Sequence, residues 1–395
     1  MTAALAQAAL DAREFIPPLD PFGIPAPAWV FQALLLVTMH LHLVFMNFAL
    51  GGPILAGVLD ALTCFRRGNH NPTVRLIWQA LPVAVSLTIT TGVAPLLFVQ
   101  VLFGSFFYTS NVFLGFVWLA IVPLMLAGFY LVYAVSYRMS NALSGRVGAW
   151  NHTPGRRLAW TAIAALLFVA VAWILTNNHM LSVQPQLWPE GGEWRQNRAA
   201  VSPAITLPRF FHNLGGALLM TGLWVACIGA WRRWRGVDPP ELADATLRIG
   251  LRTYAAMLAA MIVLGPTLLL VLPGDVRGGL LRPTALSVLW WLALLLIVVQ
   301  AALAYAALRR RDQSGWIVAL AVVTLISLAG MLAGREQVRL EYLARDGVGF
   351  SLSHWPVRTQ TSSLVAFLVS LAAAIVTVIW LVAISVRAPR TPAGK

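Results

Sequence analysis

Long apolar stretches separated by short polar segments run through almost the whole chain. Nine of them contain roughly 20 or more mainly apolar residues with no charge near the centre, which is the length that an α-helix needs to cross the hydrocarbon core of a bilayer. They cover residues 29–59, 76–103, 112–137, 159–182, 210–230, 254–272, 285–308, 316–333 and 363–386. The pattern predicts an all-α, polytopic membrane protein with nine transmembrane helices.

The basic residues predict how these helices are oriented. Alternate loops and the carboxyl-terminal tail together hold 18 of the 28 lysines and arginines. Because basic loops are retained in the cytoplasm during insertion, the amino terminus is predicted outside and the carboxyl terminus inside. The predicted organisation is an extracytoplasmic segment at 1–28, one nine-helix membrane domain at 29–386 and a cytoplasmic tail at 387–395.

Composition supports a membrane location and excludes other classes. Hydrophobic residues make up 59% of the chain and charged residues 11%, values outside the range of ordinary soluble domains. The net charge of +14 comes mostly from the basic loops and their contact with anionic lipid, so no nucleic-acid partner is implied. Cys64 and Cys227 are isolated in the sequence, which predicts neither a disulfide nor a CxxCH motif.

Acidic residues are almost absent from the predicted spans. No Asp or Glu occurs between Asp60 and Glu190, and none of the 14 acidic residues falls in the middle of a span. A channel or pump that moves protons or metal cations through buried carboxylates is therefore disfavoured. Histidine is the ionisable residue that remains inside the membrane.

The predicted topology divides the seven histidines into groups. His70 and His152 lie in cytoplasmic loops, and His354 lies in the last outer loop. His179 ends the fourth span and His212 begins the fifth, both at the outer side. His40 and His42 lie within the first span, where two residues correspond to a rotation of about 200°, so only one of them can face the bundle interior at a given site.

A neutral imidazole buried among helices is a common protein ligand of haem iron. The stretches "FALGGP" and "HNLGG" add Gly51 and Gly215, which would let a flat macrocycle approach the backbone. The commoner alternative is a buried histidine that donates a hydrogen bond to a backbone carbonyl. We expect His42 and His212 to be the iron ligands, and His40 to satisfy a carbonyl or to line a helix interface.

Four stretches resemble subunit I of the cytochrome bd quinol oxidases and their relatives. They are "FQALLLVTMHLHLVFMNFALGG", "GVAPLLFVQVLFG", "WILTNN" and "RFFHNLGGALLMTG", and the two that contain histidines are the more specific. The resemblance implies a multi-pass protein of the bacterial inner (plasma) membrane with nine spans and one or two b-type haems. It also implies that His42 ligates a haem at an oxygen-reducing centre, and that His212 ligates the low-spin haem that takes electrons from quinol.

The chain departs from that family in four places. The outer connection "LPGDVRGGLLRPTA" between spans six and seven is a mere turn instead of a long quinol-binding loop, and the third span lacks the family's glutamates. The seventh span lacks the methionine that completes the low-spin haem, and Gly334 stands where the eighth span should supply a glutamate, with Glu336 two residues later. Oxygen reduction by the family mechanism is therefore disfavoured, and any quinol site must be built differently.

Other residues could complete the low-spin haem. A hairpin of the fourth and fifth spans would bring His179 close to His212, and two imidazoles suit an electron-transfer haem. The alternative is that His179 is simply an interfacial residue. Met257 and Met261 in the sixth span are further candidates, although methionine in such a position more often fills packing gaps.

Three functions stay open at this point. The first is a membrane-embedded haem b protein that passes electrons between the quinone pool and a periplasmic c-type cytochrome or another membrane subunit, in the manner of a quinol oxidoreductase. The second is subunit I of a divergent terminal oxidase, and the third is a haemless scaffold or transporter. For the first, we expect the partner to dock on mixed charges of the outer loops, which are Arg195, Arg198, Arg335, Arg339, Arg345, Glu190, Glu193, Glu336 and Glu341.

Overall fold

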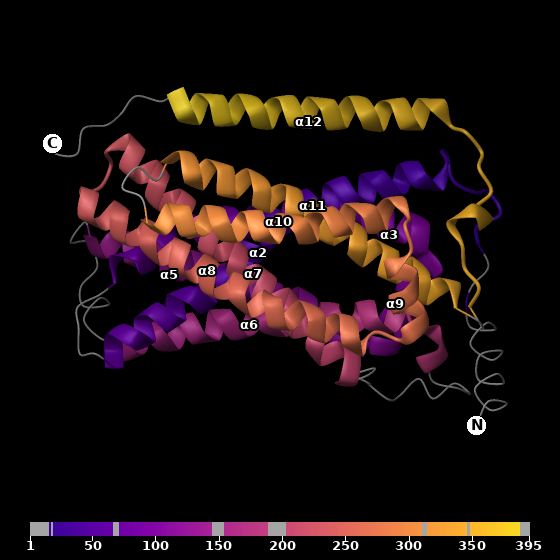
Figure 1. Cartoon of the computed structure of the whole chain (residues 1–395), viewed down its shortest axis with the longest axis horizontal. Helices are drawn as coiled ribbons and strands as arrows, with labels where there is room; N and C mark the ends of the chain where they lie inside the picture. Colours follow the sequence, from indigo (N-terminus) through magenta and orange to yellow (C-terminus); the bar gives the residue numbers. More distant parts are fainter. Residues whose placement is uncertain are drawn as a thin grey trace.

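The computed structural model describes residue 16 and residues 19–65, 71–143, 154–188, 203–309, 314–345 and 348–387. Nearly all of these residues are helical, and the described part contains no β-structure beyond one isolated bridge between Ile24 and Val357. The long helices run roughly along the long axis of the molecule (Figure 1). The all-α architecture predicted from the apolar pattern is confirmed.

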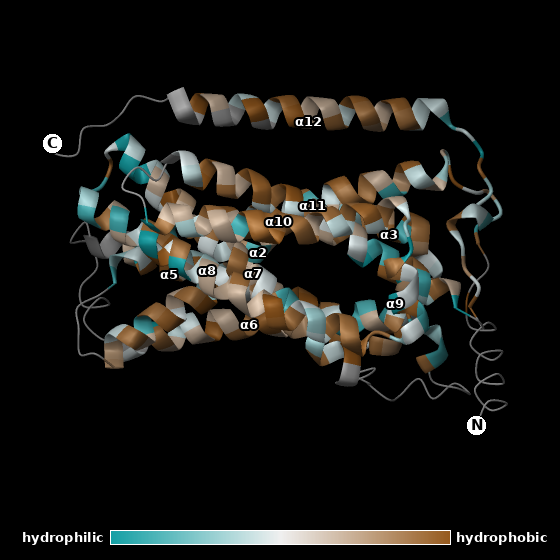
Figure 2. Cartoon of the chain, viewed as in Figure 1, coloured by the Kyte–Doolittle hydropathy of each residue, from teal (hydrophilic) through white to brown (hydrophobic). Residues whose placement is uncertain are grey.

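Each predicted span corresponds to one long helix, or in one case to two consecutive helices. They are α2 (Ala28–Phe65), α3 (Pro72–Leu114), α4 (Phe116–Leu119) with α5 (Ile121–Leu143), α6 (Pro154–Ser182), α7 (Pro203–Arg235), α8 (Pro240–Val271), α10 (Ala285–Arg309), α11 (Ser314–Ala344) and α12 (Thr361–Arg387). Within the described residues, eight helical segments are long and apolar enough to cross a membrane, with α4 and α5 counted together. The apolar part of α12 at Thr361–Thr377 is shorter. Hydrophobic residues dominate the middle of the helices (Figure 2).

The segments that precede α2 and α12 are joined to each other. The backbone N–H of Ile24 donates to the carbonyl of Pro356 at 2.9 Å, and the N–H of Arg358 donates to the carbonyl of Ile24 at 3.0 Å. The first and last helices therefore begin at the same end of the bundle, as an odd number of spans requires. This end is called the outer end below, after the predicted topology, and the opposite end is called the inner end.

Several helices extend beyond the predicted spans, and α11 does so most clearly. The apolar pattern stops at Ala333, and residues 334–362 are predicted to be an outer loop. The structure shows that α11 continues to Ala344. The prediction is wrong because Glu336 and Arg339 face the protein interior, where they are buried instead of solvated.

The connection between the sixth and seventh spans is also more ordered than predicted. Instead of a mere turn, it contains the eight-residue helix α9 (Gly274–Leu281). Val276 and Leu280 of this helix belong to a hydrophobic cluster that also contains Val338 and Tyr342 of α11. Helix α9 therefore covers the outer end of α11.

The last helix, α12, contacts the rest of the bundle mainly near its outer end. The rings of Phe367 and Phe98 are 5.6 Å apart and nearly perpendicular. Most of the described residues of α12 are exposed, and the helix runs apart from its neighbours (Figure 1). The outer halves of α2, α6, α7 and α11 lie within the bundle and hold the polar residues described next.

Candidate functional site

A group of polar residues, some buried and some partly exposed, lies at the outer ends of α6, α7 and α11. We call it the arginine–histidine cluster, and its members are His179, Arg209, His212, Arg335, Glu336 and Arg339. Arg209, Glu336 and Arg339 are each 6% exposed or less. Charged side chains at such positions are rare in membrane proteins and mark functional sites by default.

Helical periodicity explains how the cluster forms. On α7, Arg209, His212 and Gly216 follow one another at spacings of three and four residues, so they lie on one face of the helix. On α11, Arg335 and Arg339 are four residues apart and share a face in the same way. The two faces meet at the outer end, where Arg209 lies within electrostatic reach of both Arg335 and Arg339.

The cluster carries more positive than negative charge. Arg339 forms an ion pair with Glu336 at 3.2 Å. Arg209 donates to the sulfur of Met180 at 3.1 Å, and neither Arg209 nor Arg335 forms an ion pair with a carboxylate of the described residues. Three arginines and one glutamate leave an excess of two positive charges in a place where unbalanced charge is costly. The arrangement is suited to an anion.

One ring nitrogen of His212 is inaccessible to solvent, and the other is accessible. Its Nδ1 is sealed from solvent and has no hydrogen bond, whereas Nε2 is not sealed and likewise makes no hydrogen bond to the described residues. A Cβ atom added at Gly216, one turn further along the same face of α7, would meet nothing within 4 Å. The structure therefore leaves open space at Gly216, on the face of α7 that carries His212.

His42 is held against α3. Its Nδ1 lies 3.1 Å from the carbonyl oxygen of Thr88. A carbonyl only accepts hydrogen bonds, so Nδ1 carries the proton and Nε2 of the neutral ring keeps a lone pair free for a metal. The ring lies within electrostatic reach of Arg335, which connects His42 to the arginine–histidine cluster.

Of the two roles left open for His40, the carbonyl bond is not observed, while iron ligation by His42 stays a prediction. His42, and not His40, donates to a backbone carbonyl, while Nδ1 of His40 is buried with no hydrogen bond to the described residues. Eleven residues correspond to about three helical turns, so His40 lies on the same face of α2 as Gly51. That face packs against α7, which agrees with the expectation that His40 lines a helix interface.

His179 lies among the arginines. It is within electrostatic reach of Arg209, Arg335 and Arg339, and its Nε2 is sealed without a hydrogen bond. The outer ends of α6 and α7 do approach each other, since the rings of Trp173 and Phe210 are 5.1 Å apart. The structure gives no contact between His179 and His212, so their joint ligation of one haem stays a prediction.

The two glycines named as cofactor contacts lie between helices. A Cβ atom at Gly51 would collide with Thr221 and Ala217 of α7, and one at Gly215 would meet Leu264 and Met261 of α8. Both glycines thus allow close helix packing. Sequence reasoning missed Gly216, although its position four residues after His212 places it on the histidine face of α7.

The predicted docking surface for a partner is wrong in part. Arg339 and Glu336 are buried in the membrane domain, so they cannot meet a periplasmic protein at its surface. Arg345 remains near the surface and pairs with Asp275 at 2.7 Å, and Glu341 accepts from Gln337 at 2.7 Å. Arg335 belongs to the arginine–histidine cluster, and four further residues lie outside the described residues, namely Glu190, Glu193, Arg195 and Arg198.

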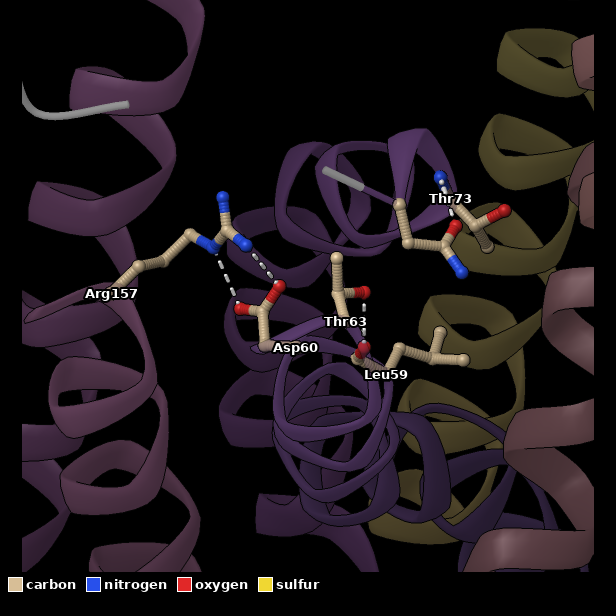
Figure 3. A network of polar contacts seen from close by, with 6 residues as sticks. Leu59, Asp60, Thr63, Thr73 and Arg157 are labelled. Atoms are coloured by element: carbon tan, nitrogen blue, oxygen red, sulfur yellow. Dashed lines mark hydrogen bonds and ion pairs between the residues drawn. The ribbon is translucent and has the colours of Figure 1, made fainter. Parts of the chain in front are cut away.

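A second buried charge pair lies at the inner end. Arg157 of α6 and Asp60 of α2 form two contacts, Nε to Oδ2 at 2.8 Å and Nη2 to Oδ1 at 2.6 Å (Figure 3). Their side chains are 3% and 0% exposed. Arg157 was expected to face the cytoplasm and lipid headgroups, and the structure instead places it in the core. Asp60 is about 27 Å from His42 along α2, so the pair joins two helices far from the cluster.

Met257, Met261 and the other side chains that could ligate a metal add little to the candidate site. Met257 and Met261 pack against a hydrophobic cluster that contains Leu258 and Leu320. The described residues contain no group of three or more His, Cys, Asp and Glu side chains that could hold a metal ion on their own.

Comparison with known proteins agrees with the architecture. No family model matches the sequence, and no curated protein matches it. A chain in the structure of bd oxidase from Geobacillus thermodenitrificans is similar, with a TM-score of 0.67 over 92% of this chain and 99% of that chain, at 14% sequence identity. The chain therefore has the fold of that bd oxidase chain.

Proposed function

We propose that this chain is a haem b protein of a respiratory electron-transfer chain in the bacterial inner membrane. It passes electrons between the quinone pool and a periplasmic c-type cytochrome or another membrane subunit. The observation that carries the proposal is the excess of two positive charges in the cluster, beside an imidazole with a free nitrogen.

Haem b fits the chemistry of these residues. It combines an iron that takes imidazole nitrogen with two propionate carboxylates, which match the two excess charges of the cluster. Arg209 and Arg335, which have no described carboxylate partner, would hold the propionates, and His212 would ligate the iron. The open space at Gly216 favours a flat group next to His212.

When bound, haem supplies one-electron chemistry, and the chain sets its conditions. The buried arginines stabilise negative charge and favour the reduced state of a nearby redox centre. The apolar helices keep water from the outer half of the bundle, which strengthens this electrostatic effect. His42, whose Nε2 is free, offers a ligand for a second haem close to Arg335.

The direct test follows electrons through the purified protein. Addition of a quinol analogue should reduce the bound haem, and an oxidised c-type cytochrome should then reoxidise it. Haem that neither quinol nor reduced cytochrome c can reduce would contradict the proposed function. The same preparation without bound haem would favour the haemless scaffold or transporter.

A terminal oxidase is the second candidate, because the chain shares the fold of a bd oxidase chain. The helix α5 and the preceding α4 contain no acidic residue, which argues against the family mechanism of proton delivery. Oxygen consumption by membranes supplied with quinol distinguishes the two. Consumption that depends on His42 would support the oxidase.

A further inference from the structure

The contact between α2 and α3 fixes the imidazole of His42 in two ways. The Thr88 carbonyl accepts from Nδ1 at 3.1 Å, and the ring also lies close to Gly92, one turn further along α3. A Cβ atom at Gly92 would stand 2.9 Å from Cε1 and 3.1 Å from Nδ1 of His42. Side-chain atoms are not found at the shorter of these distances, so any residue other than glycine at position 92 must move the ring.

The two restraints together select one nitrogen. The carbonyl sets the tautomer, because the proton must be on Nδ1, and Gly92 sets the distance of the ring from α3. Histidines that bind metals commonly donate their second N–H to a carbonyl or carboxylate, which orients the ring and makes the free nitrogen more basic. Nε2 of His42 makes no hydrogen bond to the described residues and is not sealed off.

We propose that Gly92 and the Thr88 carbonyl are positioning groups that hold His42 with Nε2 presented to haem iron. The inference rests on the proposed function, since it needs a haem at His42. It gives α3 a part in the redox site although α3 supplies no ligand. Gly92 acts only through the imidazole of His42.

The test compares Gly92→Ala with His42→Ala, with the double variant Gly92→Ala/His42→Ala and with a control variant. Gly92→Ala should retain haem but shift its absorption maximum and reduction potential, because the ligand ring is displaced. His42→Ala should lose the haem signal that depends on this ligand. The control is Gly104→Ala on the same helix, where an added Cβ would make only an ordinary contact of 3.6 Å with Tyr108, and it should behave like the wild type.

The double variant Gly92→Ala/His42→Ala decides whether the glycine acts through the histidine. With the imidazole gone, the added methyl has room, so the double variant should match His42→Ala in spectrum and thermal stability. Gly92→Ala with a wild-type spectrum and potential would overturn the proposal, as would fully additive losses in the double variant. If the Gly92→Ala protein does not accumulate, the double variant should accumulate again, because the ring that the methyl group would hit is gone. A double variant that also fails to accumulate would contradict the contact. Absence of haem from the wild type would instead refute the proposed function, and the stability comparison would still test the contact.

Discussion

At the scale of single residues, the unusual feature is a pair of arginines inside the bundle, Arg209 and Arg335, that form no ion pair with a carboxylate of the described residues. Arg335 is connected electrostatically to both His42 and His179, so its charge acts on either of the candidate iron ligands. A positive charge near a redox centre stabilises the reduced form, which carries one positive charge fewer. The effect is larger here than in water because the surroundings are apolar.

Replacing Arg335 with glutamine should therefore lower the reduction potential of the haem. Two unit charges about 8 Å apart interact by about 2 kcal/mol at an effective dielectric constant of about 20. That energy corresponds to several tens of millivolts for one electron. A spectroscopic redox titration measures the shift. Arg345→Gln is the matched control, because Arg345 is more exposed and pairs with Asp275; an equal shift in both variants would contradict a specific role of Arg335.

Single residues also show where sequence reasoning reaches its limit. The sequence identified His42 and His212, because histidine within an apolar stretch is visible without any structure. It left two roles open for His40, a carbonyl bond or a helix interface, since the direction of a side chain depends on the neighbouring helix and not on the span itself. The open space at Gly216 and the close approach at Gly92 likewise depend on helices far apart in the sequence.

At the scale of elements, the Asp60–Arg157 pair joins α2 to α6 at the inner end. Asp60→Asn removes the negative charge opposite a buried arginine and should destabilise the protein by about 3–5 kcal/mol. Thermal unfolding in detergent measures the loss. Asp244→Asn is the control, because its pair with Arg233 is partly exposed and worth at most about 1 kcal/mol.

The haem spectrum of folded Asp60→Asn should be unchanged, because the pair is far from the cluster. A spectral change in the folded variant would mean that the inner end communicates with the candidate site. That result would contradict the purely structural role assigned to this pair.

A second element-level prediction concerns the connection between α7 and α8. The hydrogen bond from Arg232 lowers the pKa of Asp238 below its ordinary value, and burial opposes this shift only in part. A carboxyl whose pKa is lowered by folding stabilises the folded state above its unfolded pKa of about 3.9, and this contribution is lost as the pH falls through the folded value. Asp238→Asn should thus lower the unfolding temperature at pH 7.

The pH dependence provides the check on that assignment. The difference in unfolding temperature between the wild type and Asp238→Asn should shrink as the pH falls below about 4. A difference that stays constant down to pH 3 would show that charge on Asp238 does not contribute. Glu241→Gln, at the exposed start of α8, is a suitable control.

The elements themselves follow closely from hydropathy, except where helices carry polar residues inward. The apolar pattern predicts nine spans because most of the surface of each helix faces lipid. It ends α11 too early, because the outer part of the bundle buries arginine and glutamate in place of leucine. It misses α9 because that helix is only eight residues long. Hydropathy cannot separate a solvated loop from a helix that surrounds a polar site.

At the scale of the whole molecule, the buried charged side chains of the described residues lie in two separate places. The inner one is a charge-balanced pair, which needs no further partner to be neutral. The outer one carries excess positive charge, which an anionic cofactor would balance. The fold is shared with a bd oxidase chain, and the cluster provides the residues on which the proposed redox role rests.

The most direct test of this account is the reduced-minus-oxidised absorption spectrum of the purified protein, compared with that of His212→Ala. The account predicts a Soret band and b-type bands in the wild type, and loss of at least one haem in His212→Ala. The exposed His354→Ala serves as control and should keep the wild-type spectrum. A wild-type protein without a Soret band, or a His212→Ala protein with every haem signal intact, would contradict the central claim.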